Sequence, residues 1–212
     1  MFRWAIVADP FCDAYPDAMA ALSHRLYLEE VRSGNPDPPR TESLLTGAIH
    51  WEAKAVSLST RDFQKTSRLA GLFLERYGVG RRREDLKASI YWTGRALEIN
   101  PYSAEKLWDR ANLLVMDRRR DEAENDLARA VSMEPNFCRG YDKLAELTKG
   151  TDDLEARGWK ARAGKCWDAA RGRTLEENER WLVVEPEPTP IAGMGRDEDG
   201  KPDLPSAFSP SR

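Results

Sequence analysis

Two stretches decide the fold of this chain: Ala96-Leu97-Glu98-Ile99-Asn100-Pro101 and Ala130-Val131-Ser132-Met133-Glu134-Pro135. Each reads alanine, apolar, polar, apolar, polar, proline, and the second begins 34 residues after the first. A period of this length is typical of helix–turn–helix units that bury their apolar faces by stacking on one another. The pair therefore predicts a helical solenoid and not a domain built around one central core.

Two weaker copies of the phrase extend the series towards the N-terminus. They are Ala5-Ile6-Val7-Ala8-Asp9-Pro10 and Ala55-Val56-Ser57-Leu58-Ser59-Thr60, so the spacings along the series are 50, 41 and 34 residues. The excess over 34 indicates inserted residues in the first two units. We place the insertions near residues 34–41 and 77–83, where proline or glycine is frequent.

Tryptophan precedes alanine by four residues at three places in the same register. The pairs are Trp51 with Ala55, Trp92 with Ala96, and Trp159 with Ala163. Residues four apart share a helix face, so each pair is expected to pack where neighbouring helices stack. The copy at Ala130 breaks the rule, because Asp126 stands in the tryptophan position.

Helical periodicity and breaker residues predict nine helices, at 2–8, 17–32, 42–58, 62–77, 84–99, 104–116, 121–133, 138–148 and 154–179. Ser103 and Asp121 are expected to be N-caps, and an aspartate within 151–153 is expected to cap the last helix. Pro101 and Pro135 separate one unit from the next. We expect a repeat domain over residues 1–179 and a disordered tail, rich in Pro, Asp and Ser, over 180–212.

The charge balance argues against nucleic acid or an anionic membrane as a partner. The 33 basic and 36 acidic residues are intermingled and give a net charge of −3. No apolar run approaches the ~20 residues of a membrane-spanning helix, so direct membrane insertion is not expected. The N-terminus likewise lacks an apolar signal-peptide core of adequate length.

The residues that most often carry chemistry are few. Cys12, Cys138 and Cys166 are widely spaced, which favours three buried free thiols over a metal site. His50 is expected at a helix surface, and His24 lies on a first helix without an evident partner. We therefore expect no catalytic apparatus, no metal and no cofactor. A stand-alone hydrolase would need His24 as its base.

With this register the chain resembles the tetratricopeptide repeat (TPR) family. The best match runs from Ala104 to Phe137, through Leu107, Ala111 and Leu114 in the first helix and Ala123, Leu127, Ala130 and Pro135 in the second. Arg110 departs from the pattern, because the family has leucine there. In the last unit Ala156, Trp159 and Ala163 match only after a two-residue shift, and Lys160 stands where an apolar residue is expected.

The resemblance implies an all-α fold, a right-handed superhelical solenoid of about four antiparallel helix pairs. In that family the first helices line a concave groove that holds a peptide or partner protein. Carrying the outward first-helix positions onto this sequence gives the candidate binding residues Gln64, Arg68, Glu105, Trp108, Asn112, Arg139, Asp142 and Lys143. The implied function is a non-catalytic scaffold for protein–protein interaction, with the oligomeric state left open.

A second resemblance gives an alternative. The phrases at Ala5, Ala96 and Ala130 are similar to soluble repeat regions that follow the membrane part of O-antigen ligase-like proteins. The chain would then be the C-terminal accessory domain of a glycosyl-transferring membrane enzyme. A free-standing chain is expected in the cytoplasm, and a domain of such an enzyme outside it.

Overall fold

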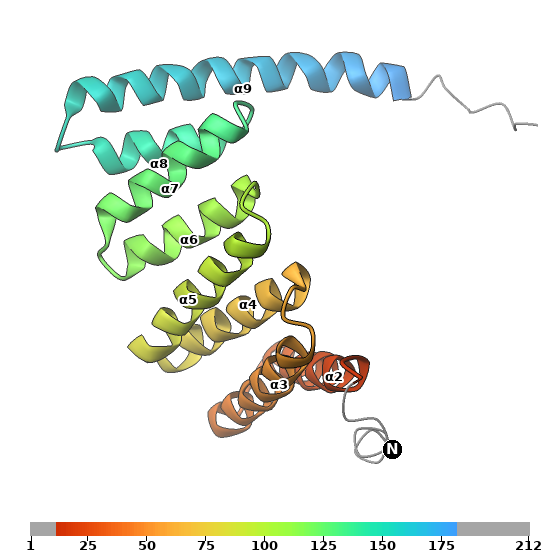
Figure 1. Ribbon diagram of the computed structural model, residues 1–212. Coiled ribbons are helices and arrows are strands. Elements are labelled where there is room, and N and C mark those ends of the chain that lie inside the picture. Colours follow the sequence, from red (N-terminus) through yellow and green to blue (C-terminus); the bar gives the residue numbers. More distant parts are fainter. Residues whose placement is uncertain (1–11, 182–212) are drawn as a thin grey trace, which may run out of the picture. The chain divides into compact units, whose positions relative to one another are not determined.

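The computed structural model describes the backbone of residues 12–181 and the side chains of residues 12–171. This part of the chain contains eight helices and no strand (Figure 1). The helices are α2 (Ala14–Arg32), α3 (Pro38–Leu58), α4 (Phe63–Gly80), α5 (Arg83–Ile99), α6 (Ala104–Met116), α7 (Arg120–Met133), α8 (Cys138–Thr148) and α9 (Asp153–Trp181). The helix expected at 2–8 and the tail expected beyond residue 181 lie outside the described residues.

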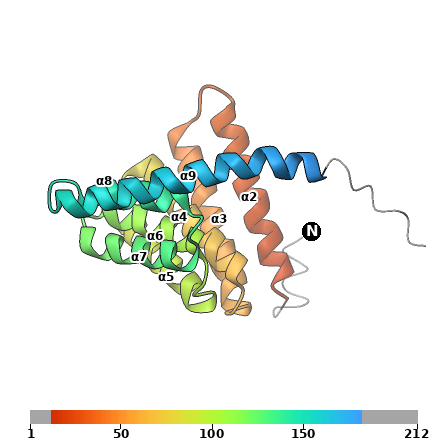
Figure 2. The same cartoon turned by 90° about the horizontal axis from the view of Figure 1, so that it is seen from above.

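The helices pack in the order in which they follow along the chain. The pairs α2 with α3, α4 with α5, and α6 with α7 each pack together, and α3 on α4, α5 on α6, and α7 on α8 join one pair to the next. Figure 1 shows this order, and Figure 2 shows the same helices from above, where those of successive units overlap. This arrangement confirms the predicted all-α solenoid of antiparallel helix pairs.

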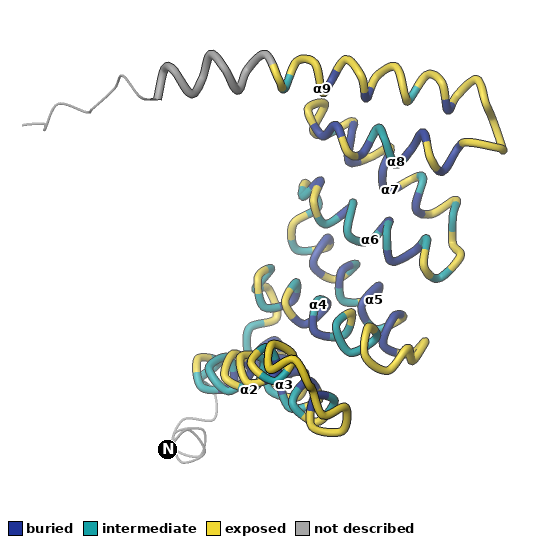
Figure 3. The backbone as a smooth tube through the Cα atoms, turned by 180° about the vertical axis from the view of Figure 1, so that it is seen from behind, coloured by how far each residue is buried: buried dark blue, intermediate teal, exposed yellow. Residues whose placement is uncertain are grey.

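The apolar residues form a series of clusters along the stack. Leu45, Leu69 and Leu72 belong to a cluster in the first units, while Leu127 and Leu144 belong to another further on. Figure 3 shows the buried stretches distributed along successive helices. Each unit therefore completes its core with its neighbours, as expected for a repeat protein.

The tryptophan–alanine register is confirmed. Ala55, Ala96 and Ala130 have no exposed surface, and Ala163 is 1% exposed. Trp51, Trp92 and Trp159 are half-buried on the same helix faces. The small side chain allows close approach of the neighbouring helix, and the large one covers the edge of the contact.

Two of the predicted N-caps are observed, and the third is not. The Ser103 side chain accepts a hydrogen bond from the Lys106 amide (3.3 Å), and Asp152 accepts from the amides of Leu154 and Glu155 (2.9 and 3.0 Å), as predicted. The expected Asp121 cap is wrong. Helix α7 begins one residue earlier, at Arg120, so Asp121 lies in its first turn. A carboxylate there interacts favourably with the positive end of the helix dipole.

The helix α3 begins four residues earlier than expected. Pro38 and Pro39 occupy its first two positions, where proline needs no amide hydrogen and its fixed φ suits a helix. Proline there starts the helix instead of extending the loop. The loop after α2 is thereby reduced to residues 33–37.

The seven extra residues of the unit that begins with α4 are mainly helical. Helices α4 and α5 have 18 and 17 residues, whereas the corresponding helices α6 and α7 of the next unit have 13 and 14. The turn between α4 and α5 consists of Arg81 and Arg82 alone. The unit is therefore longer along its helix axes.

Two departures from the repeat pattern compensate each other. Arg110 stands where the pattern expects leucine, and Asp126 where it expects tryptophan. The Arg110 guanidinium donates two hydrogen bonds to the Asp126 carboxylate, at 2.6 and 2.5 Å, from α6 to α7. Asp126 is only 7% exposed, and the bond to it raises the pKa of Arg110. A bidentate ion pair thus replaces an apolar contact between the two helices.

The expectation of three free thiols is wrong for two of them. Cys138, the first residue of α8, forms a disulfide with Cys166 of α9, with the two Cα atoms 5.3 Å apart. The pairing depends on how the last two helices pack, so the sequence spacing did not reveal it. Cys12 is free and half-buried.

The compact unit that contains the stack ends at Ala170, within α9. The remainder of α9 belongs to a second unit, 171–212, of which only residues 171–181 are described. A domain boundary at 179–180 stays a prediction. Within the described helices, none is both long enough and apolar enough to cross a bilayer.

Candidate partner-binding groove

Two pockets lie between successive first helices of the repeat units. The α2/α4 pocket has a volume of about 360 Å³ and is lined by Asp17, Ala20, Ala21, His24, Arg25, Leu28, Glu52, Arg68, Gly71, Leu72 and Glu75. The α4/α6 pocket, about 280 Å³, is lined by Ser67, Ala70, Gly71, Leu74, Ser89, Thr93, Lys106, Asp109, Asn112, Leu113 and Met116. Gly71 lines both, so the two pockets adjoin on α4. We call them together the first-helix groove.

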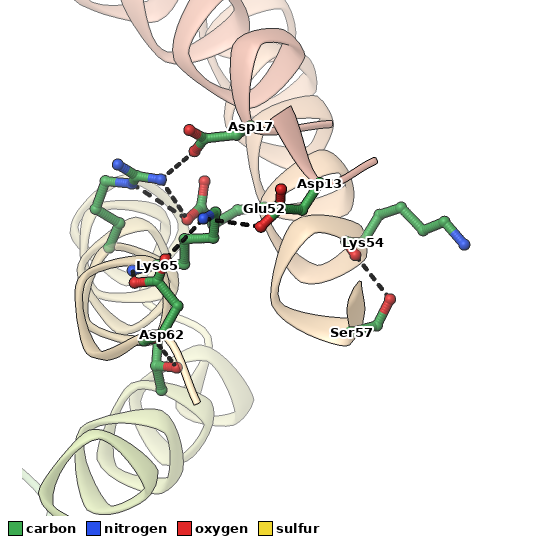
Figure 4. A network of polar contacts seen from close by, with 9 residues as sticks. Asp13, Asp17, Glu52, Lys54, Ser57, Asp62 and Lys65 are labelled. Atoms are coloured by element: carbon green, nitrogen blue, oxygen red, sulfur yellow. Dashed lines mark hydrogen bonds and ion pairs between the residues drawn. The ribbon is translucent and has the colours of Figure 1, made fainter. Parts of the chain in front are cut away.

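A charge network lies at one end of the α2/α4 pocket. The Arg68 Nε donates to the Glu52 carboxylate at 3.2 Å, and the same guanidinium forms an ion pair with Asp17. Helices α2, α3 and α4 each supply one of these three residues. In Figure 4, Asp17 and Glu52 can be seen approaching the same region from two helices.

Glu52 is the most deeply buried charged residue of this network. It is 2% exposed, and burial raises its pKa, opposed by the nearby Arg68 charge. An ionised carboxylate at this depth is costly even when it is paired. A perturbed acid in a pocket is a feature of functional sites as well as of structural ion pairs.

A second ion-pair group connects α2 with the start of α4 (Figure 4). Lys65 Nζ lies 2.7 Å from the carboxylate of Asp62, the N-cap of α4, and 3.1 Å from that of Asp13. The hydrogen bonds to Lys65 lower the pKa of both aspartates, and the bond to Asp62 raises the pKa of Lys65. Lys65 thus holds the N-terminal end of α2 against the first turn of α4.

His24 has a partner, contrary to expectation. Its Nε2 lies 2.8 Å from a carboxylate oxygen of Glu75, and its ring stacks on Tyr27 with centroids 5.8 Å apart. The contact joins α2 to α4 at the other end of the α2/α4 pocket. His50 is exposed on α3, as expected.

The α4/α6 pocket contains a hydroxyl without a partner. The Ser67 Oγ is buried, and no hydrogen-bond partner for it is found among the described residues. Asn112 donates from Nδ2 to the backbone oxygen of Trp108, 3.0 Å away. Lys106 and Asp109 pair with each other at 2.7 Å. The pocket thus offers polar groups beside the apolar side chains of Leu74 and Met116.

The eight predicted binding residues lie on three successive first helices, α4, α6 and α8. Arg68 lines the α2/α4 pocket and Asn112 the α4/α6 pocket, while Gln64 and Glu105 are exposed beside them. Trp108 packs against the core and meets Phe137 edge-on, with ring centroids 5.8 Å apart. The Arg139 guanidinium lies 5.4 Å from the centre of the Trp108 ring. Trp108 therefore contributes to the packing between α6 and α8.

The last two predicted residues make contacts within the final unit. Lys143 pairs with Glu146 at 2.9 Å. Asp142 accepts hydrogen bonds from Lys160 and from Trp167 of α9, at 2.8 and 2.7 Å, and these bonds lower its pKa. Asp142 also lines a pocket of about 560 Å³ between α8 and α9.

Sequence reasoning missed Glu52, Ser67 and Gly71. One signal for Glu52 was present, because it interrupts an apolar stripe that runs through Ile49 and Val56 on the same face of α3. Ser67 and Gly71 carry no such signal, since small residues on a helix are ordinary. Among the described residues no cluster of metal-ligating side chains was found.

The comparisons with known proteins concern the fold. No family model matches the chain, and no curated protein matches it. A crystal structure of MamA is similar, with 16% identity over 84% of this chain and 87% of that one and a TM-score of 0.55. A structure of MamA AMB-1 shows 13% identity, coverage of 79% and 86%, and a TM-score of 0.55.

PilF from Pseudomonas aeruginosa is also similar. It shares 14% identity over 78% of this chain and 65% of the other, with a TM-score of 0.53. At such low identity these structures show the common helical-repeat fold alone.

Proposed function

We propose that this protein is a non-catalytic scaffold for protein–protein interaction, and that the first-helix groove holds a peptide or an extended segment of a partner protein. The observation that carries the proposal is the pair of adjoining pockets between α2, α4 and α6. Peptide-binding grooves combine pockets for side chains with polar groups for the backbone. Successive pockets along a repeat array suit a ligand that is itself extended.

The lining suggests the character of the segment. Leu28 and Leu72 provide apolar surface in the α2/α4 pocket, whose burial yields roughly 25 cal/mol per Å². Three carboxylates face that pocket, against the guanidiniums of Arg25 and Arg68. Arg25 is paired with Glu29. Within the described residues the three carboxylates then have only Arg68 and His24 as partners, so negative charge remains in excess. An apolar side chain next to a lysine or arginine is therefore the favoured occupant.

The alternative, an accessory domain of an O-antigen ligase-like membrane enzyme, gains no support from the comparisons and stays a prediction. It is tested by the DNA that precedes the Met1 codon. An in-frame continuation encoding several ~20-residue apolar segments would support it. An in-frame stop codon would discard it.

The groove is tested best at Gly71. A Cβ placed there meets no atom within 4 Å, so Gly71→Met should leave the helix intact while it places a new side chain at the border that the two pockets share. Gly78→Met is the matched control, because Gly78 lies on the same helix, also has open space around it, and lines neither pocket. Substitutions at Arg68 or Trp108 are less suitable, since both residues support the fold.

The experiment selects binders from a random peptide library on the unaltered protein and measures their affinities by fluorescence anisotropy. We expect the selected peptides to bind Gly71→Met about tenfold more weakly or worse, a loss of about 1.4 kcal/mol, and Gly78→Met normally. The proposal fails if no peptide is enriched, or if both variants bind equally well.

A further inference from the structure

A hollow of about 340 Å³ lies between the turn that follows α4 and the turn that follows α6. Arg81 reaches it from the first turn, Arg83 from the first residue of α5 and Arg118 from the second turn, so two successive repeat units contribute to it. Tyr77, Leu86, Met116 and Asp117 complete its lining. Arginine thus supplies three of the seven lining residues.

The hollow carries an excess of positive charge. Its one carboxylate, that of Asp117, is 7% exposed and accepts hydrogen bonds from Nε and from a terminal nitrogen of Arg83, at 3.2 and 3.1 Å. For Arg81 and Arg118 no carboxylate partner is found within the described residues, whereas ten other arginines there have one. Two guanidiniums therefore remain available to an anion.

The backbone at Arg81 and Arg118 is unusual in the same way. Their φ angles are 53° and 65°, and they are the two non-glycine residues with positive φ in the described range. The left-handed conformation costs a residue with a Cβ roughly 1–2 kcal/mol, which glycine avoids. Arginine at both positions is thus more costly for the backbone than glycine. A general preference for cations near a helix end does not explain the choice, because an arginine in the last helical turn satisfies it without this cost.

Two of the three guanidiniums have contacts that orient them before any ligand arrives. Arg83, whose side chain is 69% exposed, is hydrogen-bonded to Asp117, and the Arg81 guanidinium lies 5.7 Å from the centre of the Tyr77 ring, in a cation–π contact. Groups oriented in advance lose less conformational entropy on binding. The hollow therefore resembles a prepared site more than a chance gathering of surface charges.

We propose that this hollow, the arginine-turn site, binds a phosphate-type oxyanion. Guanidinium groups donate paired hydrogen bonds that match the oxygens of phosphate, and a dianion balances the two arginines that lack a carboxylate. Oxyanion binding at this site does not depend on the peptide binding proposed for the first-helix groove. Met116 lines both the arginine-turn site and the α4/α6 pocket.

The test titrates the full chain with inorganic phosphate and, separately, with O-phosphoserine, while backbone amide shifts are followed by NMR. Sodium chloride at equal ionic strength is the reference. Arg81→Gly combined with Arg118→Gly removes both guanidiniums, and glycine suits the left-handed backbone, so the fold is retained. Arg61→Gly, at an exposed arginine in the turn before α4, removes like charge elsewhere.

We expect saturable shifts at residues 81–83 and 117–118 in the unaltered chain and in Arg61→Gly, and binding about tenfold weaker or worse in the double variant. Tighter binding of O-phosphoserine than of inorganic phosphate would assign the site to a phosphorylated side chain. The reverse order would assign it to the free anion. Equal shifts with chloride, or undiminished binding by the double variant, would overturn the proposal.

Discussion

At the scale of single residues, the Arg110–Asp126 pair shows how a repeat unit can leave its pattern and still pack. Each residue alone would place a charge in an apolar interface. Together they replace the apolar contact with two short hydrogen bonds. The sequence contained both departures, but only the structure shows that they face each other across α6 and α7.

The first prediction concerns this pair. Asp126→Ala leaves the Arg110 charge, which is 27% exposed, without its partner, so we expect a loss of about 3 kcal/mol in the free energy of unfolding. Arg110→Leu with Asp126→Trp restores the residues that the repeat pattern expects and should recover most of it. Urea denaturation measures both.

Glu98→Ala is the control for the pair, because its partner Arg95 is about half exposed and such surface pairs contribute at most about 1 kcal/mol. A double variant no more stable than Asp126→Ala would show that the two departures are unrelated.

The second prediction concerns Glu52, whose pKa is raised by burial above the ordinary value of 4.5. The folded state then binds the proton more readily than the unfolded state. The contribution of Glu52 to stability is therefore fully present below pH 4.5 and is lost as the pH rises through the folded-state pKa. Glu52→Gln mimics the protonated form and should be at least as stable as the unaltered protein at pH 7.

Thermal unfolding across pH 4–8 measures this difference. The stability of Glu52→Gln relative to the unaltered chain should grow as the pH rises through that interval. A strong loss of stability in Glu52→Gln at pH 7 would instead mean that the ionised carboxylate, through Arg68, supports the fold. That result would assign Glu52 to a structural ion pair.

At the scale of elements, α9 is attached differently from the other helices. Its described buried residues are few: Ala156, Ala163 and Cys166. Its contacts with α8 include the disulfide, the stacked rings of Tyr141 and Trp159, and the hydrogen bonds to Asp142. Most of the described surface of α9 is exposed (Figure 3). A covalent bond thus supplements a thin apolar contact.

The third prediction follows. The disulfide closes a loop with a sequence separation of 28 residues, and its removal by Cys166→Ser should destabilise the packing of α9 by about 3–4 kcal/mol. Hydrogen exchange should accelerate over residues 154–170 and stay slow in α4 and α5. Cys12→Ser, at a free thiol, is the control. Unchanged exchange in α9 would mean that the ring stack and the Asp142 bonds hold the helix without the disulfide.

Helix positions were largely readable from the sequence, because breaker residues and apolar periodicity act locally. Helices α6 and α8 have the predicted bounds, and Pro101 and Pro135 lie in turns. The start of α3 was misplaced because proline was read as a breaker at a position where it begins a helix. The disulfide and the His24–Glu75 contact were beyond sequence reasoning, since each depends on how separate helices pack.

At the scale of the whole stack, stability is shared between neighbours and not concentrated in one core. The fold could be predicted because the repeat phrase fixes a register that holds along the chain. The groove could be predicted only in part. The repeat pattern points to Arg68 and Asn112, and these residues line the two pockets. It also points to Trp108 and Asp142, which contact other residues of this chain. The repeat pattern does not predict those contacts.

The fourth prediction tests whether stability is shared between neighbouring units. Leu107 is completely buried in the central unit, so Leu107→Ala should cost about 2–5 kcal/mol. In a stack of nearest-neighbour contacts the loss should appear as faster hydrogen exchange in α5, α6, α7 and α8, with α2 and α3 little changed. Uniform acceleration along all helices would mean that the described stack unfolds as one cooperative unit.

Gly71 joins two cavities at a single backbone position, and this has a consequence for selectivity. A ligand long enough to occupy both is tethered by its first contact when it makes the second, so it gains avidity from the short link between them. Two separate short ligands have no such link and must share the space above one α-carbon. The protein should therefore discriminate by the spacing of side chains along a ligand, even where each side chain alone binds weakly.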